Sequence, residues 1–214
     1  MANIIQTGFI CMGFFSTMLG GMELDVPLIY QYPNFPTGCE SVSTVEMLQY
    51  NGYSITPDEF IDNYLDTISY EDSLKVETEN IFDCYFLGNP RSSHGFLCNP
   101  PVLYSAVEEY FSELNDVSKS PVDLTGTSFE FLLDELAVGN PVVIWLTIGY
   151  KEPCERDVNG STYYTPSHTV CLSGYNLEKG VVYINDPIDG YVELDINKAK
   201  YLYDKVGRKS FTVR

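Results

Sequence analysis

The sequence predicts an α+β fold, with helices mostly in its N-terminal part and an antiparallel sheet mostly in its C-terminal part. Before residue 140, apolar residues recur at helical spacing behind helix-start signals. From Pro141 onward, short apolar runs are separated by turn residues, which is typical of strands. The chain has no internal repeat or low-complexity linker, so we expect residues 24–214 to form a single domain.

Four helices are expected before Pro141, and each has a recognisable start. Three starts have the spacing of a capping box, in which Thr and a Glu three residues later bond each other's backbone: Thr37 with Glu40, Thr56 with Glu59, and Thr127 with Glu130. The other helix opens with prolines at its first turn. The expected helices run from Cys39 to Gln49, Thr56 to about Leu65, Asn99 to Phe111 and Thr127 to Gly139, and residues 66–98 are loop-rich.

The C-terminal part predicts five strands and one more helix. The strands are expected at 141–147, 168–175, 181–186, 191–194 and 209–213, and the helix at 195–206 with Asp195 as its N-cap. A short polar turn links the second and third of these strands, so we expect them to form a hairpin. Residues 149–165 are polar and rich in turn formers, and we expect a surface loop there.

The composition is that of a folded, strongly acidic protein. Its 44% apolar and 14% aromatic residues argue against disorder, and 214 residues suffice for one core. With 30 acidic and 12 basic residues the net charge is −18, which argues against nucleic acid and anionic membranes as partners. We interpret the charge as a source of solubility, with attraction of a basic peptide substrate as the alternative.

Residues 1–23 form an apolar N-terminal segment. The run from Gly8 to Met22 is too short to span a membrane and resembles the apolar core of a signal peptide, although no basic residue precedes it. We therefore expect an export-signal remnant and a secreted or cell-surface protein. The alternative is a segment packed on the domain of a cytoplasmic protein. No other stretch is long enough to span a bilayer.

The six cysteines include no C-x-x-C pair, which argues against a structural zinc site or a thioredoxin-like motif. We expect neither a metal nor a cofactor. Cys84 and Cys98 lie in the loop-rich region, where a disulfide and two free thiols both remain open. Cys171 lies in an apolar strand pattern and is expected in the core.

Cys39 stands at the start of a predicted helix. Free N–H groups and the positive end of the helix dipole favour a thiolate at such a position. Cys39 is therefore a candidate nucleophile, and a nucleophilic thiol needs a base.

Of the two histidines, His168 is the stronger candidate for that base. It begins the first strand of the predicted hairpin and Asp186 ends the second, so the two lie opposite each other. A carboxylate there can orient the imidazole, whereas Asn185 should point to the other face. A structural histidine and a turn-forming Asp are the alternatives. His94 is expected to be a solvated loop histidine, with a substrate contact at a nearby cleft as its alternative.

Short segments spread along the chain match a known family in order. They are Leu24–Leu28, Gln31, Pro36–Glu40, Gly88–Pro90, Gly95–Cys98, Pro141–Trp145, His168, Gly174-Tyr175, Asn185–Pro187 and Gly190. With this set the chain resembles the papain-like cysteine peptidases, and within them the bacterial peptidases related to double-glycine-leader (bacteriocin-processing) peptidases. It is most similar to stand-alone members. The resemblance runs from about residue 24 to the C-terminus and implies a papain-like fold, with N-terminal helices packed on a C-terminal antiparallel sheet.

The resemblance implies a role for four residues. Cys39 matches the nucleophile, His168 the general base and acid, and Asp186 the group that orients the imidazole. Gln31 matches the glutamine whose amide helps to stabilise the oxyanion, together with the backbone N–H of Cys39. Glu40 departs from the pattern, because leader-processing members often carry Gly at this position, and it argues against leader-type specificity.

We therefore expect a cysteine peptidase that hydrolyses peptide bonds through a Cys-His-Asp triad and a thioester intermediate. Acyl transfer to an amine on the same triad and a non-catalytic peptide-binding module are the alternatives, and the intact set of four residues argues against the module. The expected partner is a peptide or protein substrate, and the chain is expected to be a monomer. Loops at 66–98 and 149–165 are expected to wall the cleft, and their sequence does not specify the substrate.

Overall fold

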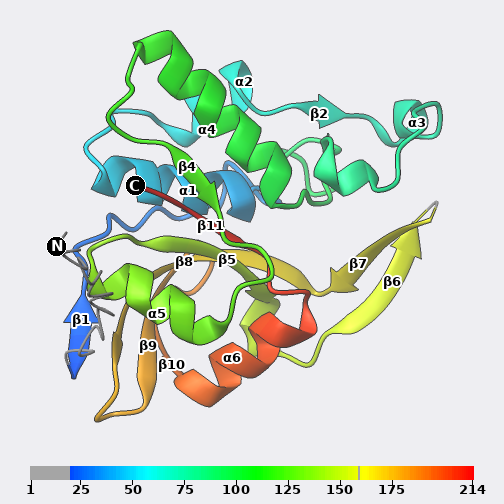
Figure 1. Ribbon diagram of the computed structural model, residues 1–214. Helices are drawn as coiled ribbons and strands as arrows, with labels where there is room; N and C mark the ends of the chain where they lie inside the picture. The colour runs from blue at the N-terminus through cyan, green and yellow to red at the C-terminus, as the bar shows by residue number, and fades with distance from the viewer. Residues whose placement is uncertain (1–19, 159) are drawn as a thin grey trace, which may run out of the picture.

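The computed structural model describes residues 20–158 and 160–214 (Figure 1). The predicted export-signal remnant lies almost entirely outside these residues and stays a prediction. Within the described ranges, no helix has both the length and the apolar character needed to cross a membrane.

A seven-stranded sheet runs through the middle of the molecule (Figure 1). Its order is β10 (Gly190–Asp195), β9 (Val181–Asp186), β8 (Ser167–Asn176), β5 (Val142–Thr147), β11 (Ser210–Val213) and β4 (Pro121–Asp123), and β1 (Gly21–Glu23) also pairs with β8. All of these pairings are antiparallel. The five strands predicted after Pro141 are confirmed, whereas the three-residue strands β1 and β4 are too short to show a sequence period.

Helices cover both faces of this sheet, which confirms the predicted α+β class. The first face carries α1 (Cys39–Tyr50), α2 (Pro57–Asn63) and α4 (Pro100–Leu114), and the second carries α5 (Phe129–Ala137) and α6 (Ile196–Lys205) (Figure 1). Successive residues of β5 point to opposite faces. Val143 and Trp145 belong to the core beneath α1 and α4, whereas Val142 and Ile144 belong to the core beneath α5 and α6. Both faces of β5 and β8 are therefore buried, so close packing on both sides holds β8, the strand that carries His168, in place.

Two segments outside the sheet form a third, smaller cluster. Residues 66–98 are loop-rich as predicted and contain β2 (Thr67–Ile68), α3 (Tyr70–Ser73), a 3₁₀ turn (Ile81–Asp83) and β3 (Phe86–Leu87). The prediction of a loop at 149–165 is wrong. After a turn at Ile148–Tyr150, these residues form a hairpin of β6 (Cys154–Val158) and β7 (Ser161–Thr165). Most of β6 is exposed, so the hairpin lacks the apolar run that would have predicted it.

The three predicted capping boxes have different outcomes. The box of Thr56 and Glu59 is confirmed, since each side chain bonds the other's backbone N–H. The helix predicted from Thr127 is instead capped by Ser128, whose hydroxyl accepts the N–H of Phe131. The box predicted at α1 is wrong, because Gly38 is its N-cap and makes no side-chain cap.

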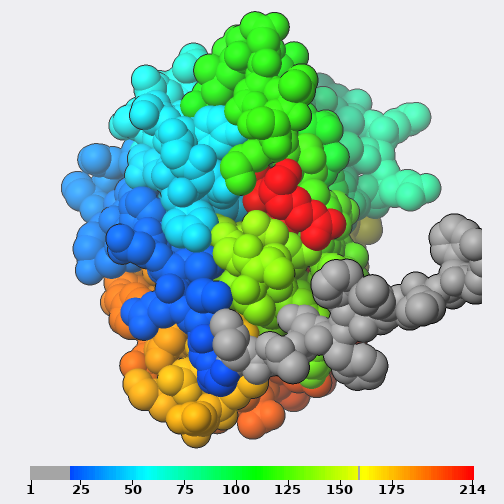
Figure 2. Space-filling model, turned by 60° about the vertical axis from the view of Figure 1, so that its left-hand side comes forward, coloured from blue at the N-terminus to red at the C-terminus, as the bar shows by residue number. Residues whose placement is uncertain are grey.

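The chain before α1 runs along the seam between the helices and the sheet. Figure 2 shows this segment in blue, between the early helices in cyan and the strands β8–β10 in gold and orange. Asn185 Nδ2 donates to the carbonyl of Val26 at 2.8 Å, and the N–H of Gln31 donates to the carbonyl of Pro187 at 2.9 Å. The segment thus joins the start of α1 to the end of β9.

Candidate active site

Cys39 is the first residue of α1, and its neighbours are held by close packing. A Cβ added to Gly38 would lie 2.8 Å from the Cβ of Phe35, so a larger residue would force the chain to shift. The Thr37 hydroxyl, which was predicted to cap α1, donates to the carbonyl of Ser92 at 2.9 Å. The start of α1 is therefore fixed against the loop at residues 88–96.

The thiol of Cys39 contacts two groups. It donates to Glu40 Oε2 at 3.2 Å, and the backbone N–H of Thr169, the residue after His168, lies close enough to lower the pKa of the thiol. The other carboxylate oxygen of Glu40 accepts the N–H of Cys98 at 3.4 Å. Both Cys39 and Glu40 are buried. Glu40 is therefore a direct neighbour of the thiol and not a helix cap.

Burial, and then the charge of Glu40, raise the pKa of Cys39 well above its ordinary value. The thiolate expected at this helix start is therefore not the resting form, because enclosure beside a carboxylate outweighs the helix dipole and the Thr169 N–H. Burial also raises the pKa of Glu40 to about 7, although hydrogen bonds from its neighbours lower it. The thiol thus donates its hydrogen bond to a carboxyl group whose pKa lies near neutral pH.

We expect Glu40→Gln to speed the alkylation of Cys39 by iodoacetamide at pH 8 by about 10-fold, the equivalent of one pKa unit. The substitution removes the negative charge that opposes the thiolate and keeps the side-chain shape. Because the pKa of Glu40 is about 7, the difference from wild type should shrink below pH 6, where Glu40 is neutral in the wild type as well. Peptide mass spectrometry gives the rate at Cys39.

Glu109→Gln, an exposed change on α4, is the matched control and should leave the rate unchanged. Slower alkylation of Cys39 in Glu40→Gln would show that Glu40 activates the thiol.

The structure brings His168 and Asp186 together. His168 Nε2 lies 2.7 Å from Asp186 Oδ1, and both side chains are buried. Since a carboxylate oxygen accepts, Nε2 carries the proton and Nδ1 is left with a free lone pair. Within the described residues, His168 Nδ1 is buried without a hydrogen-bond partner. Nδ1 is therefore the atom that can receive a proton.

Asp186 is held by more than the histidine. Its Oδ1 also accepts the N–H groups of Ile188 and Asp189, at 2.8 and 3.2 Å, and its Oδ2 accepts the hydroxyl of Tyr150 at 2.7 Å. Burial raises the pKa of Asp186, but the hydrogen bonds from His168 and Tyr150 outweigh it and lower that pKa to about 2. Asp186 is therefore a fixed anion at neutral pH.

Tyr150 was not among the residues that sequence analysis placed in the site. It follows Gly149, and both residues have positive φ angles, 55° for Tyr150 and 62° for Gly149. This turn aims the phenol back at the end of β9, 36 residues further along the chain. A Gly before the aromatic residue was the only available signal, and many surface turns share it.

Gln31 lies between the two halves of the site. Its side chain is 2% exposed, and Nε2 donates to the carbonyl of Pro36 at 3.1 Å. Its backbone N–H donates to Pro187, next to Asp186. One N–H of the amide nitrogen therefore remains for another acceptor. Oε1 is buried with no partner in the described part of the chain.

The other candidates lie apart from this group. Asn185 faces the segment before α1, where its amide bonds Val26. His94 is exposed in the loop at 88–96. Cys84 and Cys98 are both free thiols, the first exposed and the second buried, and Cys171 is buried as predicted. Over residues 20–158 and 160–214, no group of three or more His, Cys, Asp or Glu side chains is arranged to hold a metal ion.

A helix that begins at a buried cysteine, packed on an antiparallel sheet that carries a buried histidine–aspartate pair, defines the papain-like cysteine peptidase architecture. The model of the Peptidase_C39 like family matches residues 23–211. The chain belongs to this family of cysteine peptidases, which confirms the resemblance seen in the sequence.

The individual proteins to which the chain is similar share 28% identity with it or less. The chain is 28% identical to the uncharacterized protein YvpB of Bacillus subtilis (strain 168) over 173 residues, covering 77% of this chain and 61% of YvpB. It thus spans about three fifths of that relative. A crystal structure of a Bacillus anthracis protein described as a C39-like peptidase superposes with a TM-score of 0.76 at 24% identity, over 91% of this chain and 97% of that one. A double-glycine-motif protease from a transporter, in complex with its leader peptide, gives a TM-score of 0.46 at 14% identity, over 90% and 91%.

Proposed function

We propose that this chain hydrolyses peptide bonds, with Cys39 as nucleophile, His168 as general base and acid, and Asp186 as the group that orients the imidazole. The observation that carries the proposal is the buried His168–Asp186 pair, in which His168 Nδ1 is free to accept a proton. The backbone N–H of the next residue, Thr169, lies beside the thiol of Cys39. A nucleophile, a base and an orienting carboxylate are the three parts that this chemistry needs.

The first half of the reaction forms a thioester. The Cys39 thiol breaks its hydrogen bond to Glu40 and gives its proton to His168 Nδ1. Cys39 Sγ then attacks the carbonyl carbon of the peptide bond. The tetrahedral intermediate carries its negative charge on the former carbonyl oxygen. His168 Nδ1–H then protonates the leaving amine as the C–N bond breaks. The acyl group stays on Sγ.

Water completes the reaction. His168 Nδ1 takes a proton from the water as its oxygen attacks the thioester carbon, and the C–S bond breaks. The carboxylic acid leaves, and the proton returns to Sγ. Throughout, Asp186 holds Nε2–H and stabilises the imidazolium that forms twice in each cycle.

Gln31 and the start of α1 are the proposed oxyanion donors. Gln31 Nε2 has one N–H left after its bond to the carbonyl of Pro36. The backbone N–H of Cys39 has no acceptor within α1, because the first N–H groups of a helix have none. Donors of this kind stabilise the charge that develops in the transition state, by about 3–4 kcal/mol each.

The proposal is tested by brief labelling with limiting iodoacetamide at pH 6, in the wild type and in His168→Ala. At this pH Glu40 is largely neutral, so its charge no longer opposes the thiolate, and a thiolate forms by proton transfer to His168. We expect the labelling rate of Cys39 to fall in His168→Ala, while the rates of the exposed Cys84 and Cys154 stay unchanged as internal references.

His94→Ala, which removes the exposed loop histidine, is the matched control and should keep the wild-type rate at Cys39. A labelling rate of Cys39 that is the same in the wild type and in His168→Ala would overturn the peptidase proposal in favour of a peptide-binding module. Addition of an amine acceptor to a cleaved peptide separates hydrolysis from acyl transfer, since only a transferase forms the ligated product.

A further inference from the structure

Glu46 is a buried carboxyl group that takes no part in the proposed reaction. It lies on α1, seven residues after Cys39, and its side chain is fully enclosed. Its Oε1 accepts the backbone N–H of Ile29 at 2.7 Å, whereas its Oε2 is buried with no partner among the described residues. Ionisation of a carboxyl group enclosed in this way is costly, because one oxygen of the carboxylate loses its hydration without gaining a hydrogen bond.

The groups around Glu46 also oppose its ionisation. Burial raises the pKa of Glu46 well above its ordinary value, and the negative charge of Asp186 on β9 raises it further, which together outweigh the bond from the N–H of Ile29. Cys171 of β8 also interacts with Glu46, and neither Asp186 nor Cys171 supplies a positive charge. Glu46 is therefore a neutral carboxylic acid beside the fixed anion of Asp186.

The bond from Ile29 to Glu46 holds the segment that carries Gln31. Ile29 precedes Gln31 by two residues, and the N–H of Gln31 donates to the carbonyl of Pro187, just after β9, at 2.9 Å. The segment is thus tied to α1 at Ile29 and to the end of β9 at Gln31. In the part of the chain that the structure describes, the Ile29–Glu46 bond is the only hydrogen bond between α1 and residues 24–31.

The helix α1 therefore connects two parts of the proposed chemistry. Cys39 stands at its start, and Glu46 lies two helical turns further along, about 10 Å down the axis. Both residues are buried, and close packing holds the helix as a rigid unit over that distance. The bond from Glu46 to Ile29 thus helps to set where Gln31 lies relative to the thiol.

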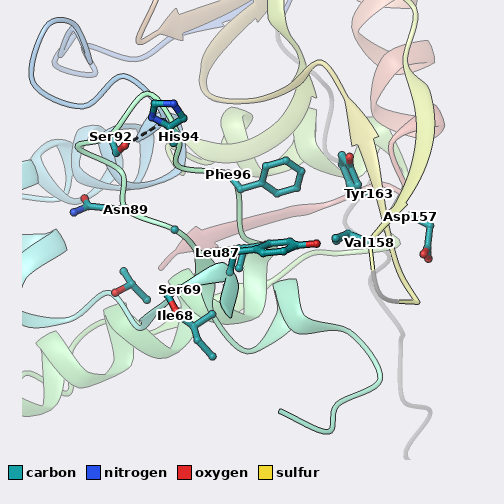
Figure 3. Close-up of a pocket in the computed structure, with 13 residues that line it drawn as sticks. Ile68, Ser69, Leu87, Asn89, Ser92, His94, Phe96, Asp157, Val158 and Tyr163 are labelled. Carbon is teal, nitrogen blue, oxygen red and sulfur yellow. Dashed lines mark hydrogen bonds between the residues drawn. The ribbon is translucent and has the colours of Figure 1, made fainter. Parts of the chain in front are cut away.

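The support on the other side of Cys39 is less enclosed. The Thr37 hydroxyl bonds the carbonyls of Asn89 and Ser92, at 3.3 and 2.9 Å. Both residues line a cavity of about 720 Å³ between the loop-rich segment and the β6–β7 hairpin (Figure 3). The loop beside Thr37 therefore borders open space, whereas packed side chains enclose Glu46. Of the two supports, Glu46 is the one that its surroundings hold more firmly.

We propose that Glu46, as a neutral carboxylic acid, is a positioning residue that holds Gln31 where its amide N–H meets the oxyanion. The inference rests on the proposed peptidase function, in which Gln31 supplies that N–H. Glu46 acts through the backbone of Ile29 and not on the reacting atoms. A neutral acid accepts the N–H of Ile29 without placing a second negative charge beside Asp186.

The test compares variants of Glu46 and Gln31, alone and combined, by steady-state kinetics. The substrate is one peptide that the wild type cleaves, found in a library made from a bacterial proteome with a Glu-specific protease. Glu46→Leu removes the acceptor of the Ile29 N–H but keeps the bulk of the side chain. It should lower kcat by about 10- to 100-fold with little change in KM. In Gln31→Ala, which lacks the donor, the further change Glu46→Leu should have little effect on kcat.

Two further variants separate positioning from a general loss of structure. Glu46→Gln keeps a neutral acceptor for the Ile29 N–H and should retain most of the wild-type kcat. Val107→Ala creates a cavity at a buried site on α4, so it should lower the melting temperature and leave the kcat of the folded protein unchanged. An equal loss of kcat from Glu46→Leu with and without Gln31 would overturn the inference, and so would a loss in Glu46→Gln as large as in Glu46→Leu.

The neutral form of Glu46 is tested without any activity. A carboxyl group whose folded pKa is raised costs stability as the pH rises above its unfolded pKa of about 4.3, because the folded state keeps a proton that the unfolded state releases. The melting temperature of Glu46→Gln should therefore rise relative to that of the wild type between about pH 4.5 and pH 7. A constant or falling difference would show that Glu46 is not a neutral acid, which overturns the inference.

Failure of the proposed function gives a different result, namely no cleavage of any peptide by the wild type. That result removes the reaction in which Gln31 serves as a donor, so it overturns both proposals. Cleavage by the wild type, combined with independent effects of Glu46→Leu and Gln31→Ala on kcat, overturns this inference alone.

Discussion

Replacement of Asp186 by Ala should lower kcat/KM for peptide hydrolysis by about 10,000-fold. The carboxylate accepts Nε2–H of His168 at 2.7 Å and so leaves Nδ1 free to take the thiol proton. An Ala side chain removes this acceptor, so neither the orientation nor the tautomer of the imidazole is fixed. The proton can then move to Nδ1, and the imidazolium that forms during the reaction loses its partner charge.

Tyr150→Phe is the matched comparison. It removes one hydrogen bond to Oδ2 and leaves the carboxylate, so we expect a loss of about 10-fold or less. Steady-state kinetics on one peptide, with thermal unfolding of each variant as the check on folding, separate the two effects. Activity of Asp186→Ala within 10-fold of the wild type would mean that His168 is held in its tautomer by another group.

The pKa of Asp186 also predicts how stability depends on pH. Its folded pKa of about 2 is below the unfolded value of about 3.9, so ionised Asp186 stabilises the fold at pH values above about 4. This contribution is lost as the pH falls through the folded pKa. The Asp186→Asn variant should therefore lose less stability than the wild type between pH 4 and pH 2.

The contact between His168 and Asp186 follows from local sequence. The apolar runs at 168–175 and 181–186 define two strands, the polar turn between them sets their pairing, and the pairing brings the ends together. Cys39 is also visible locally, because it precedes an apolar helical stripe. Gln31 has no such pattern, and only the family resemblance singled it out.

The parts that the sequence could not predict depend on contacts between distant residues. Glu40 has the spacing of a capping box, but the N–H that its Oε1 accepts comes from Cys98, 58 residues later. Tyr150 reaches Asp186 only because two consecutive residues adopt positive φ. The β6–β7 hairpin is stabilised by Tyr163 packing on Phe82 and Phe96 and not by its own polar sequence. In each case contacts between distant residues, and not the local sequence pattern, determine the structure.

We expect Gln31→Ala to lower kcat by about 100- to 1,000-fold with little change in KM. The proposed oxyanion forms only after Cys39 attacks, so a donor that meets it stabilises the transition state and not the bound peptide. Gln31 suits this role because Pro36 and Pro187 fix its side chain and backbone, and one amide N–H is left over. A donor held in advance needs no reorganisation during the reaction.

Two further variants test whether the lost hydrogen bond of Gln31 is the cause of the lower kcat. Gln31→Glu keeps the shape but replaces the donor by an acceptor, so it should lose at least as much kcat as Gln31→Ala if the missing hydrogen bond is the cause. Gln49→Ala removes a half-buried glutamine at the other end of α1, whose Nε2 bonds Ile55, and should leave kcat unchanged. A rise in KM with unchanged kcat in Gln31→Ala would place Gln31 in ground-state binding. The oxyanion would then be stabilised by the N–H of Cys39 and by a donor not yet assigned. The negative charge that forms when the thiolate attacks the peptide carbonyl needs a hydrogen-bond donor in a buried site.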